Sequence, residues 1–489
     1  MKKLLTIVLF VCGLSAGATT YYVKTGGNDG LAGTSDVNAW GTIAKIQATA
    51  FSAGDSILFK RANTFRGSLY KNAESGAAGN YIYFGAYGTG VKPKILGAKD
   101  LSASGDWTND AGNIWKTTAT LGTAQNDISN MVFNTETSWG TKQLTKVACD
   151  AQGDFFYNGT DDLLYMYSVG NPGTFYTHIE ACGNYDIDQG LLKWYESDYI
   201  IVENLDVRYS SGAGIEFRNA AHLSIKNNDI SWIGGEYVSN DGSDPYRLGN
   251  GISLIIDIDD AEVESNRISQ CYDEGIAPQG WGTYSQTNIN CHNNIIDSCW
   301  VSMSLFTRTG STIDNVKFNN NTSIEPGMGW SDNQRPDPGE EAHFRNYLNT
   351  QPATNVEICN NIFYGGKTFG MYLWAQGGFT ITNNIYYDIP TDAYYRSTSY
   401  TLAQFQAATG FDANSFDADP LFVSASDFHL QAASPAKDAG ISLGLSVDFD
   451  ATPIGYLPDI GAFEFEDIRM ATVDDKIVMN TGKIVTIRK

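Results

Sequence analysis

The sequence is poor in positive charge. It has 32 Lys and Arg residues against 55 Asp and Glu residues, which gives a formal net charge of −23. A nucleic-acid-binding surface needs a basic patch, so this balance argues against that class of protein. Acidity alone indicates solubility and carries no further functional meaning.

Long apolar runs are also lacking after the first residues. Lys2 and Lys3 precede an apolar segment at 4–14, which is too short to span a bilayer, and Ala-Gly-Ala at 16–18 fits a cleavage site. We therefore expect residues 1–18 to be a signal peptide and the mature chain to start at Thr19. The protein should be exported without a membrane span, and be secreted, held at the cell surface or kept in the periplasm.

The cysteines show no CxxC spacing, which argues against a cysteine zinc site. Seven cysteines become six once Cys12 leaves with the signal peptide. An even number in an exported protein is compatible with disulfides. Cys149 with Cys182 is one pairing, and buried free thiols are the alternative.

A repeated turn is what the sequence has in abundance. CHNNIIDSCW at 291–300 contains one copy, and each copy places an Asn after a short segment of strand pattern. In this copy Ile289 and Cys291 stand two apart before Asn294, which is the period-2 pattern of a strand. The steps between copies are 38, 28, 27, 40 and 23 residues. The aligned residues are Asn228, Asn266, Asn294, Asn321, Asn361 and Asn384.

Self-similarity at this period, carried by strands, predicts an all-β solenoid in which each copy is one coil of a parallel β-helix. The missing L-x-x-L-x-L register excludes leucine-rich repeats, and the shortest copies are too short for propeller blades. Each Asn should turn inward at a tight bend, bond the backbone and the next Asn, and adopt the left-handed conformation. Cys271 and Cys299 each stand five residues after such an Asn, so they should be stacked neighbours, bridged or free.

Longer segments carry a family resemblance. The opening YYVKTGGNDGLAGTSDVNAWGTIAKI and the closing DPLFVSASDFHLQAASPAKDAG with PDIGAFEF are two of them. All of them resemble secreted bacterial right-handed parallel β-helix proteins of the pectate-lyase-like superfamily. The resemblance implies that fold to about residue 466, with a helix at 42–51 that caps the open end of the solenoid. The similar segments occupy 21–46, 53–69, 81–97, 153–173, 419–440 and 458–465.

The resemblance is specific for the fold and leaves the activity open. The superfamily contains polysaccharide lyases, glycoside hydrolases, esterases, epimerases and phage or adhesin spikes, and fold does not choose among them. Its calcium-lyase and polygalacturonase motifs are not intact in this sequence. We expect an N-terminal cap with irregular first coils at 19–190, regular coils at 191–390, closing coils at 391–466 and a hairpin-like tail at 467–489.

Two long coils should carry the chemistry. Their insertions, 234–251 and 326–351, follow the Asn turn by similar offsets, so both should emerge on one side as the walls of a groove for a polymer. Neutral loops are the alternative. Outward residues of the second strands would form the groove floor. These are Glu216, Arg218, Ser253, Ala277, Gln279, Ser302, Ser304, Tyr372 and Trp374, with Trp281 and Arg308 just beyond the strand ends.

Glycosidic hydrolysis needs two carboxyl groups, one to protonate the leaving oxygen and one to activate water or to attack. Asp273 and Glu274 lie between the two walls and are the first candidates. Adjacent strand residues face opposite ways, so only one of the two should project into the groove unless the turn bends. A solvated turn pair is the alternative. The further carboxyl groups in this region are Glu216, Glu340 and Glu341.

A polysaccharide lyase would instead need a base at a sugar C5 proton and a cation, such as Ca²⁺, on the uronate. An unperturbed histidine titrates near neutrality, which would suit His343, and Arg345 is a more demanding base because a guanidinium stays protonated at physiological pH. Arg308 and Arg218 would hold the carboxylate. No Lys falls on the predicted floor, which disfavours this reaction.

Four aromatic residues are candidates for stacking on sugar rings: Tyr372, Trp374, Trp281 and Trp330. An aromatic side chain at an outward strand position offers a flat apolar face to a ring. Packing under a loop is the alternative.

The sequence therefore predicts an exported monomer that binds a polysaccharide and cleaves it in a groove, with hydrolysis ahead of β-elimination. A hydrolase would require no cofactor, whereas Ca²⁺ would suit a lyase. Asp241 and Asp244 are candidates to bind Ca²⁺, although NDGSD lacks the full EF-hand pattern. A non-enzymatic glycan-binding or adhesin protein is the alternative.

Overall fold

The computed structural model describes residues 17–465 except 123–126, 184–189, 238–246, 281–282, 308–309, 336–338, 348–352 and 375–377, together with three short strands near the C-terminus. The predicted signal peptide lies almost wholly outside the described residues. Within them, no helix is long and apolar enough to cross a membrane.

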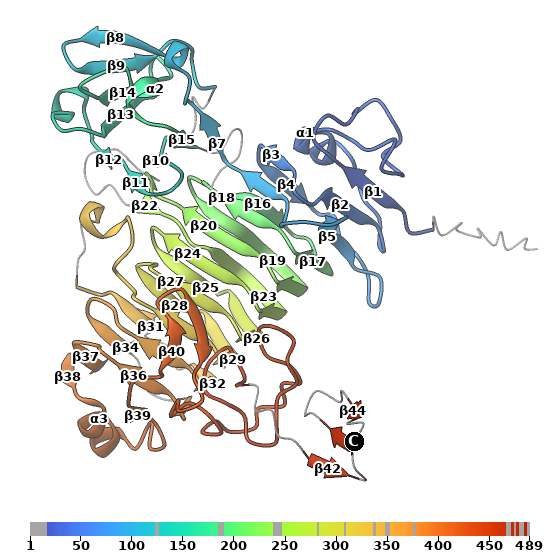
Figure 1. Ribbon diagram of the computed structural model, residues 1–489, viewed down its shortest axis with the longest axis vertical. Helices are drawn as coiled ribbons and strands as arrows, with labels where there is room; N and C mark the ends of the chain where they lie inside the picture. The colour runs from blue at the N-terminus through green and yellow to red at the C-terminus, as the bar shows by residue number, and fades with distance from the viewer. Residues whose placement is uncertain are drawn as a thin grey trace, which may run out of the picture.

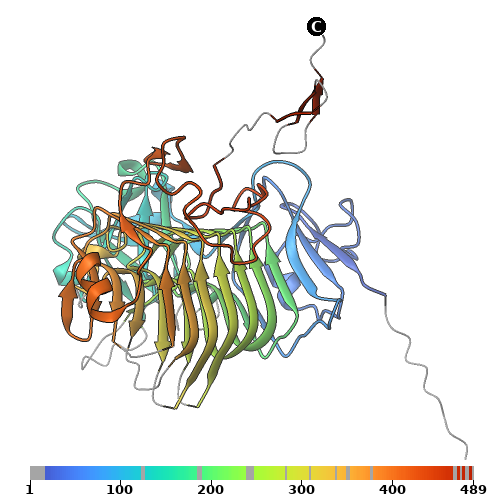
Figure 2. The same cartoon turned by 90° about the horizontal axis from the view of Figure 1, so that it is seen from below.

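The described strands wind into a stack of coils, which Figure 1 shows from one side and Figure 2 from below. They form an 18-stranded and a 10-stranded sheet, and strands of successive coils pair in parallel. This confirms the predicted parallel β-helix. The larger sheet holds β1 (Thr20–Val23), β2 (Ser56–Lys60), β4 (Leu69–Asn72), β5 (Ile82–Tyr87), β16 (Gly190–Tyr195), β17 (Ile200–Glu203), β19 (Ala213–Lys226), β23 (Ile252–Glu264), β25 (Glu274–Gly280), β26 (Ser285–His292), β28 (Val301–Thr307), β29 (Thr312–Asn319), β31 (Ala342–Tyr347), β32 (Thr354–Cys359), β34 (Phe369–Leu373), β35 (Phe379–Thr382), β37 (Thr391–Tyr395) and β38 (Thr398–Tyr400). The smaller sheet holds β3 (Thr64–Arg66), β6 (Lys94–Leu96), β18 (Asp206–Arg208), β20 (Asp229–Ile233), β24 (Arg267–Cys271), β27 (Ile295–Asp297), β30 (Thr322–Ile324), β33 (Ile362–Tyr364), β36 (Ile385–Tyr387) and β39 (Phe416–Asp417).

The core lies inside the coils and follows the alternation of the strands. Ile276 of β25 pairs with Met303 of β28, and Met303 pairs with Phe344 of β31. All three side chains are fully buried. Because apolar burial stabilises by about 25 cal/mol per Å², such rows supply most of the driving force for stacking. In each strand, the residues before and after these core positions point away from the core or lie at a corner of the coil.

The six aligned asparagines form a continuous buried ladder. Asn294 illustrates it: its Nδ2 donates to Val263 O at 2.9 Å and to Asn321 Oδ1 at 3.0 Å, and its Oδ1 accepts from Asn266 N at 3.0 Å. The left-handed conformation belongs to the residue before each ladder Asn, such as Asn293 with φ of 54°. The expectation that the ladder Asn itself adopts this conformation is therefore wrong, because the turn bends one residue earlier.

The cysteines of the described chain are all buried and free. Cys149 and Cys182 form no disulfide, so the free-thiol alternative holds for them. Cys271 and Cys299 share the core cluster without a bridge. Packing at the corner of each coil explains these two residues, since a thiol behaves there as a small apolar group.

A helix covers the N-terminal end of the solenoid. It spans Ile43–Gln47 (α1), shorter than the predicted 42–51, and Thr42 caps it by accepting from Lys45 N. Ile43 and Ile46 are buried in the main core. At the other end of the stack lies α3 (Leu402–Thr409). The hairpin of β40 (Phe422–Ser424) and β41 (Asp427–Leu430) packs on the outer face of the smaller sheet, where Phe428 joins Ile295 and Ile324. The tail forms a hairpin extended by a third strand, with β42 (Ala471–Val473), β43 (Lys476–Val478) and β44 (Ile484–Thr486).

An insert of mostly antiparallel strands interrupts the first coils. It contains the segment at 153–173 that resembles the family, and it has its own core around Phe133, Phe155 and Ile179. Its elements are β7 (Ala98–Asp100), β8 (Trp107–Ala111), β9 (Ile114–Thr117), β10 (Asn130–Phe133), β11 (Ser138–Trp139), β12 (Thr141–Lys142), β13 (Asp154–Asn158), β14 (Leu163–Tyr167), α2 (Pro172–Phe175) and β15 (Ile179–Cys182).

The two long insertions emerge on the same side, as predicted, but they meet instead of flanking an open groove. The first forms a small hairpin of β21 (Glu236–Tyr237) and β22 (Arg247–Leu248). From it Arg247 donates to Gln334 O of the second insertion at 3.3 Å, and its guanidinium lies over the ring of Tyr272. Gln334 also donates to Gly140 O of the insert. The predicted groove between two separate walls is therefore wrong for the described residues.

Candidate active site

The turn before β25 brings two acidic residues to the surface of the coil. Asp273 is the last residue of the turn, and Glu274 begins the strand. Backbone bonds to both neighbouring coils hold the turn in place. Asp273 N donates to Gly249 O at 3.1 Å on one side, and Trp300 N donates to Asp273 O at 3.1 Å on the other.

Two arginines bind this acidic pair. Arg345 of β31 donates to Glu274 Oε1 at 2.6 Å, and Arg335 of the second insertion contacts Asp273 Oδ1 at 3.1 Å. Both guanidiniums lie over the ring of Trp300, at 3.4 Å for Arg335 and 4.3 Å for Arg345. Trp300 thus orients both cations at once, since a ring face attracts a guanidinium.

The two carboxyl groups come together, contrary to the expectation that only one would face the groove. The physical reason is that Asp273 lies in the turn, where the alternation of a strand does not apply. The Glu274 side chain is 3% exposed and that of Asp273 is 13% exposed. Solvent therefore reaches the pair from the side of Asp273.

The pKa of Glu274 is raised to about 7. Burial is the main cause, and the neighbouring Asp273 carboxylate adds to it, while Arg345 and Arg335 act in the opposite direction. Glu274 Oε2 is buried and makes no conventional hydrogen bond within the described chain. Glu274 therefore keeps a proton near neutral pH, on an oxygen that no arginine holds.

This pKa predicts a dependence of stability on pH. Between the ordinary value of 4.5 and about 7, folded Glu274 keeps a proton that the unfolded chain releases. The free energy of unfolding should therefore fall as pH rises through this window, by up to about 1.4 kcal/mol per pH unit from this group. Glu274→Gln, which cannot titrate, should flatten that slope in urea denaturation at a series of pH values. An unchanged slope would mean that Glu274 is ionised throughout.

Glu340 and a group of aromatic residues border the pair. Glu340 is 30% exposed and accepts from Arg345 at 3.3 Å and from Tyr372 OH at 3.4 Å. Tyr372 stacks on Tyr394 with ring centroids 4.8 Å apart, and Trp374 beside it is 41% exposed. Sequence reasoning named Glu340, Tyr372 and Trp374, and the structure places them next to one another.

His343 is wrong as a catalytic base. It is fully buried, its Nδ1 lies 2.6 Å from Ser323 Oγ, and its Nε2 lies 2.9 Å from Gly365 O. Burial lowers its pKa to about 3. The ring sits at a corner inside the coil, against Phe363, so it reaches no substrate.

Glu341 and Glu216 are also poor candidates. Burial raises the pKa of Glu341, but hydrogen bonds from Thr368 and the backbone, among them that of Gly339, outweigh it and leave the pKa lowered. Glu216 is buried and accepts from Arg218 at 2.6 Å. Both glutamates accept hydrogen bonds from their own neighbours, and neither contacts Asp273 or Glu274.

The predicted groove floor is mostly covered. Trp330 is wrong as a sugar platform, because it is buried against Tyr272 and donates to Gln270 O. Four small floor residues are buried, whereas Arg218 and Gln279 are half-buried. Trp281, Arg308, Asp241 and Asp244 lie outside the described residues. The buried four are Ser253, Ala277, Ser302 and Ser304.

Sequence reasoning missed Arg335 and Trp300. Trp300 stands six residues after Asn294, as Tyr272 stands six after Asn266, so two successive coils place an aromatic at the same position. That alignment could have identified both aromatics as neighbours of Asp273. Arg335 had no such signal, since it lies in a long insertion outside the repeat.

Comparisons with known proteins agree with the architecture. Residues 164–335 match a family described as the right handed beta helix region. A solved structure titled glycoside hydrolase aligns with a TM-score of 0.50 at 8% identity, over 78% of this chain and 95% of that chain. Pectate lyase Pel9A aligns at 16% identity over 92% and 97% of the two chains, with a TM-score of 0.46.

A GH136 lacto-N-biosidase from Eubacterium ramulus aligns at 14% identity with a TM-score of 0.45. The alignment covers 77% of this chain and 56% of that enzyme, so this chain spans little more than half of its length. A search of curated protein sequences gives no match. At such low identities these likenesses concern the fold alone.

Proposed function

Because the strands of this chain form a parallel β-helix and residues 164–335 match a right handed beta helix region, we propose that it is an exported, monomeric enzyme that cleaves a polysaccharide by hydrolysis. The observation that carries the proposal is the pair of Asp273 and Glu274, in which the pKa of the buried Glu274 carboxyl is raised to about 7. Glycosidases need two carboxyl groups in different protonation states at the reacting bond, and their environments set that difference.

The geometry supports distinct roles for the two acids. Glu274 keeps its proton near neutrality. Its Oε2 is buried in this structure, so Glu274 would act as general acid once bound substrate brings the leaving glycosidic oxygen against it. Asp273 is more exposed and contacts Arg335. Asp273 would then activate water or attack the sugar. The water or covalent route depends on the carboxyl separation in the complex with substrate.

The remaining residues would bind and orient the sugar chain. Arg345 and Arg335 hold the two acids directly, and the ring of Trp300 orients both arginines. Trp374 offers the exposed ring face and Glu340 the exposed acceptor beside it. No metal ion enters this proposed reaction.

β-Elimination has less support. Its candidate base His343 is buried inside the coil, and Arg345 is held by both Glu274 and Glu340.

A glycan-binding protein without activity is a second candidate. The exposed Trp374 next to the stacked pair of Tyr372 and Tyr394 favours it, since such rings bind sugar faces. In that case Trp374→Ala should abolish retention on a glycan column, whereas Glu274→Gln should change nothing.

The test is a screen of the mature chain, residues 19–489, against plant, algal and host polysaccharides. Each reaction is assayed for new reducing ends and for the ultraviolet absorbance of an unsaturated uronate, with Ca²⁺ and with a chelator. We expect reducing ends without that absorbance, and no requirement for Ca²⁺. New absorbance would establish a lyase and overturn the hydrolytic mechanism. Retention on glycans without any product would favour the binding protein.

A further inference from the structure

A histidine and two glutamates converge on the outer surface of the solenoid, outside the candidate active site. β23 and β26 pair in parallel, so that Glu262 lies beside Asn290 and Glu264 lies beside His292. Val263, between the two glutamates, is fully buried in the core. Strand alternation therefore directs the two carboxylates and the imidazole to the same outer face.

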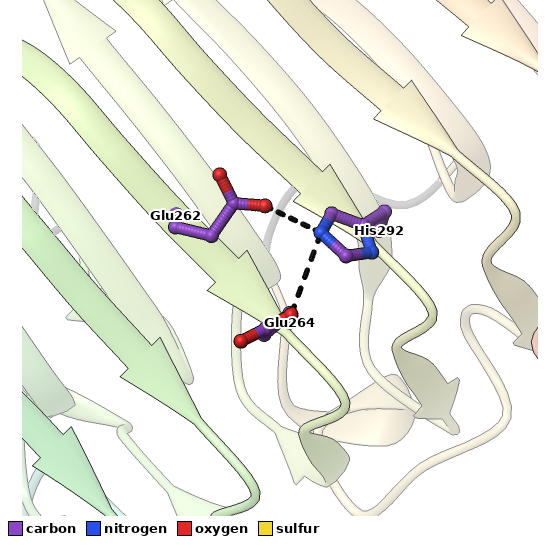
Figure 3. A group of neighbouring side chains, drawn as sticks. All are labelled: Glu262, Glu264 and His292. Atoms are coloured by element: carbon purple, nitrogen blue, oxygen red, sulfur yellow. Dashed lines mark hydrogen bonds and ion pairs between the residues drawn. The ribbon is translucent and has the colours of Figure 1, made fainter. Parts of the chain in front are cut away.

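The two carboxylates are directed at one nitrogen of the imidazole ring, as Figure 3 shows. His292 Nε2 contacts Glu262 Oε1 and lies 3.7 Å from Glu264 Oε2. The three ligand atoms lie within 4.8 Å of one another. Tetrahedral zinc with ligand bonds of about 2.1 Å places its ligand atoms about 3.4 Å apart. A small rotation of the Glu262 side chain would give that spacing.

The imidazole ring is buried, and the carboxylates remain open to solvent. The His292 side chain is 6% exposed, whereas those of Glu262 and Glu264 are 40% and 29% exposed. His292 Nδ1 is buried without a hydrogen-bond partner among the described residues, so the ring interacts only through Nε2. A fixed imidazole with two adjustable carboxylates leaves a further coordination position for water.

The protein itself neutralises the two carboxylates only in part. Asn290 Nδ2 donates to Glu262 Oε1 at 2.8 Å, and the Lys226 ammonium lies 3.9 Å from Glu264 Oε1. A divalent cation would neutralise both carboxylates. The imidazole nitrogen favours a transition metal such as Zn²⁺ over Ca²⁺ or Mg²⁺, which prefer oxygen ligands.

We propose that Glu262, Glu264 and His292 bind one Zn²⁺ ion that ties two successive coils together. The next residue, Asn293, donates to Val447 O of the closing segment at 2.8 Å, so the ion would stiffen the corner on which that segment rests. Zinc would stabilise the folded chain because the unfolded chain does not bring the three ligands together. The site does not depend on the proposed function.

The experiment uses the mature chain without an affinity tag, after treatment with a chelator. Zinc titration by calorimetry should give one ion per chain, and excess zinc should raise Tm by several degrees. His292→Gln and Glu264→Gln should each weaken zinc binding by at least about tenfold to a hundredfold, because loss of even an outer-shell partner costs that much. Co²⁺ should show tetrahedral visible bands with the wild type, and these should be lost in His292→Gln.

His429→Gln is the matched control. His429 also contacts two carboxylates, but through opposite ring nitrogens, with Nδ1 at 2.6 Å from Asp427 and Nε2 at 2.9 Å from Asp450. His429 cannot direct both carboxylates to one ion. The His429→Gln variant should therefore have the zinc affinity and the metal-dependent Tm of the wild type. Equal Tm values of all variants in chelator would show that they fold.

Two results would overturn the proposal. One is a wild type that binds no zinc, or a His292→Gln variant that keeps the wild-type affinity. The other is binding of Ca²⁺ that depends on Glu264 and not on His292, since that would be a cation site built from carboxylates alone.

Discussion

Replacing Glu274 with glutamine is expected to lower kcat on the polysaccharide substrate by about a hundredfold to ten-thousandfold, with little change in KM. Glutamine keeps the size of the side chain but has no acidic proton to give to the leaving oxygen. The measurement is the release of reducing ends under saturating substrate. Glu464→Gln is the matched control, because the pKa of Glu464 is also raised to about 7, mainly by burial, but the residue lies in the closing segment. It should keep full activity.

The pH profile provides a second measure of the same role. Wild-type kcat should fall as pH rises through about 7, since Glu274 then loses the proton it donates. Asp273→Asn removes the like charge that helps to raise the pKa of Glu274, so its residual activity should decline at a lower pH. Full activity of Glu274→Gln, or a decline unaffected by Asp273→Asn, would contradict this assignment.

Replacing Asn294 with leucine is expected to lower the free energy of unfolding by at least about 2 kcal/mol. The substitution removes four hydrogen bonds and takes the side-chain partner from two buried backbone groups, Val263 O and Asn266 N. Asn321 Oδ1 still accepts from Asn294 N, and Asn266 Nδ2 still donates to Ile225 O. Each unsatisfied buried polar group costs about 1–3 kcal/mol. Leucine keeps the branching and the number of side-chain heavy atoms, but its methyl groups are larger, so overpacking adds to the loss.

The measurement is urea denaturation of both proteins at one pH. Asn414→Ala is the control, because Asn414 is exposed and makes one side-chain bond, to Thr382 Oγ1 at 3.2 Å. It should change stability by no more than about 0.5 kcal/mol. A loss below about 1 kcal/mol in Asn294→Leu would mean that water or a relaxed turn replaces the ladder.

Several features of the site could be predicted from the sequence because they follow from the repeat. Asp273 and Glu274 were identified by their place between the two insertions, and Glu340 by its place in the second. The error about Asp273 and Glu274 facing opposite ways came from extending the strand pattern into a turn. The error about His343 arose because the sequence does not show which strand residues lie at a corner of the coil, where the side chain enters the core.

The sequence by itself determined the coil, its period and the positions of the asparagine ladder, because these depend on local alternation and on the same turn repeated at short range. Only the tertiary structure decided which side chains surround the acidic pair and the histidine. Arg335 reaches Asp273 from an insertion 62 residues away, and Arg345 reaches Glu274 across 71 residues. The raised pKa of Glu274 needs burial and a like charge together, and the cluster of Glu262, Glu264 and His292 exists only because two coils stack in register. Such contacts join residues far apart in the chain, and no local pattern encodes them.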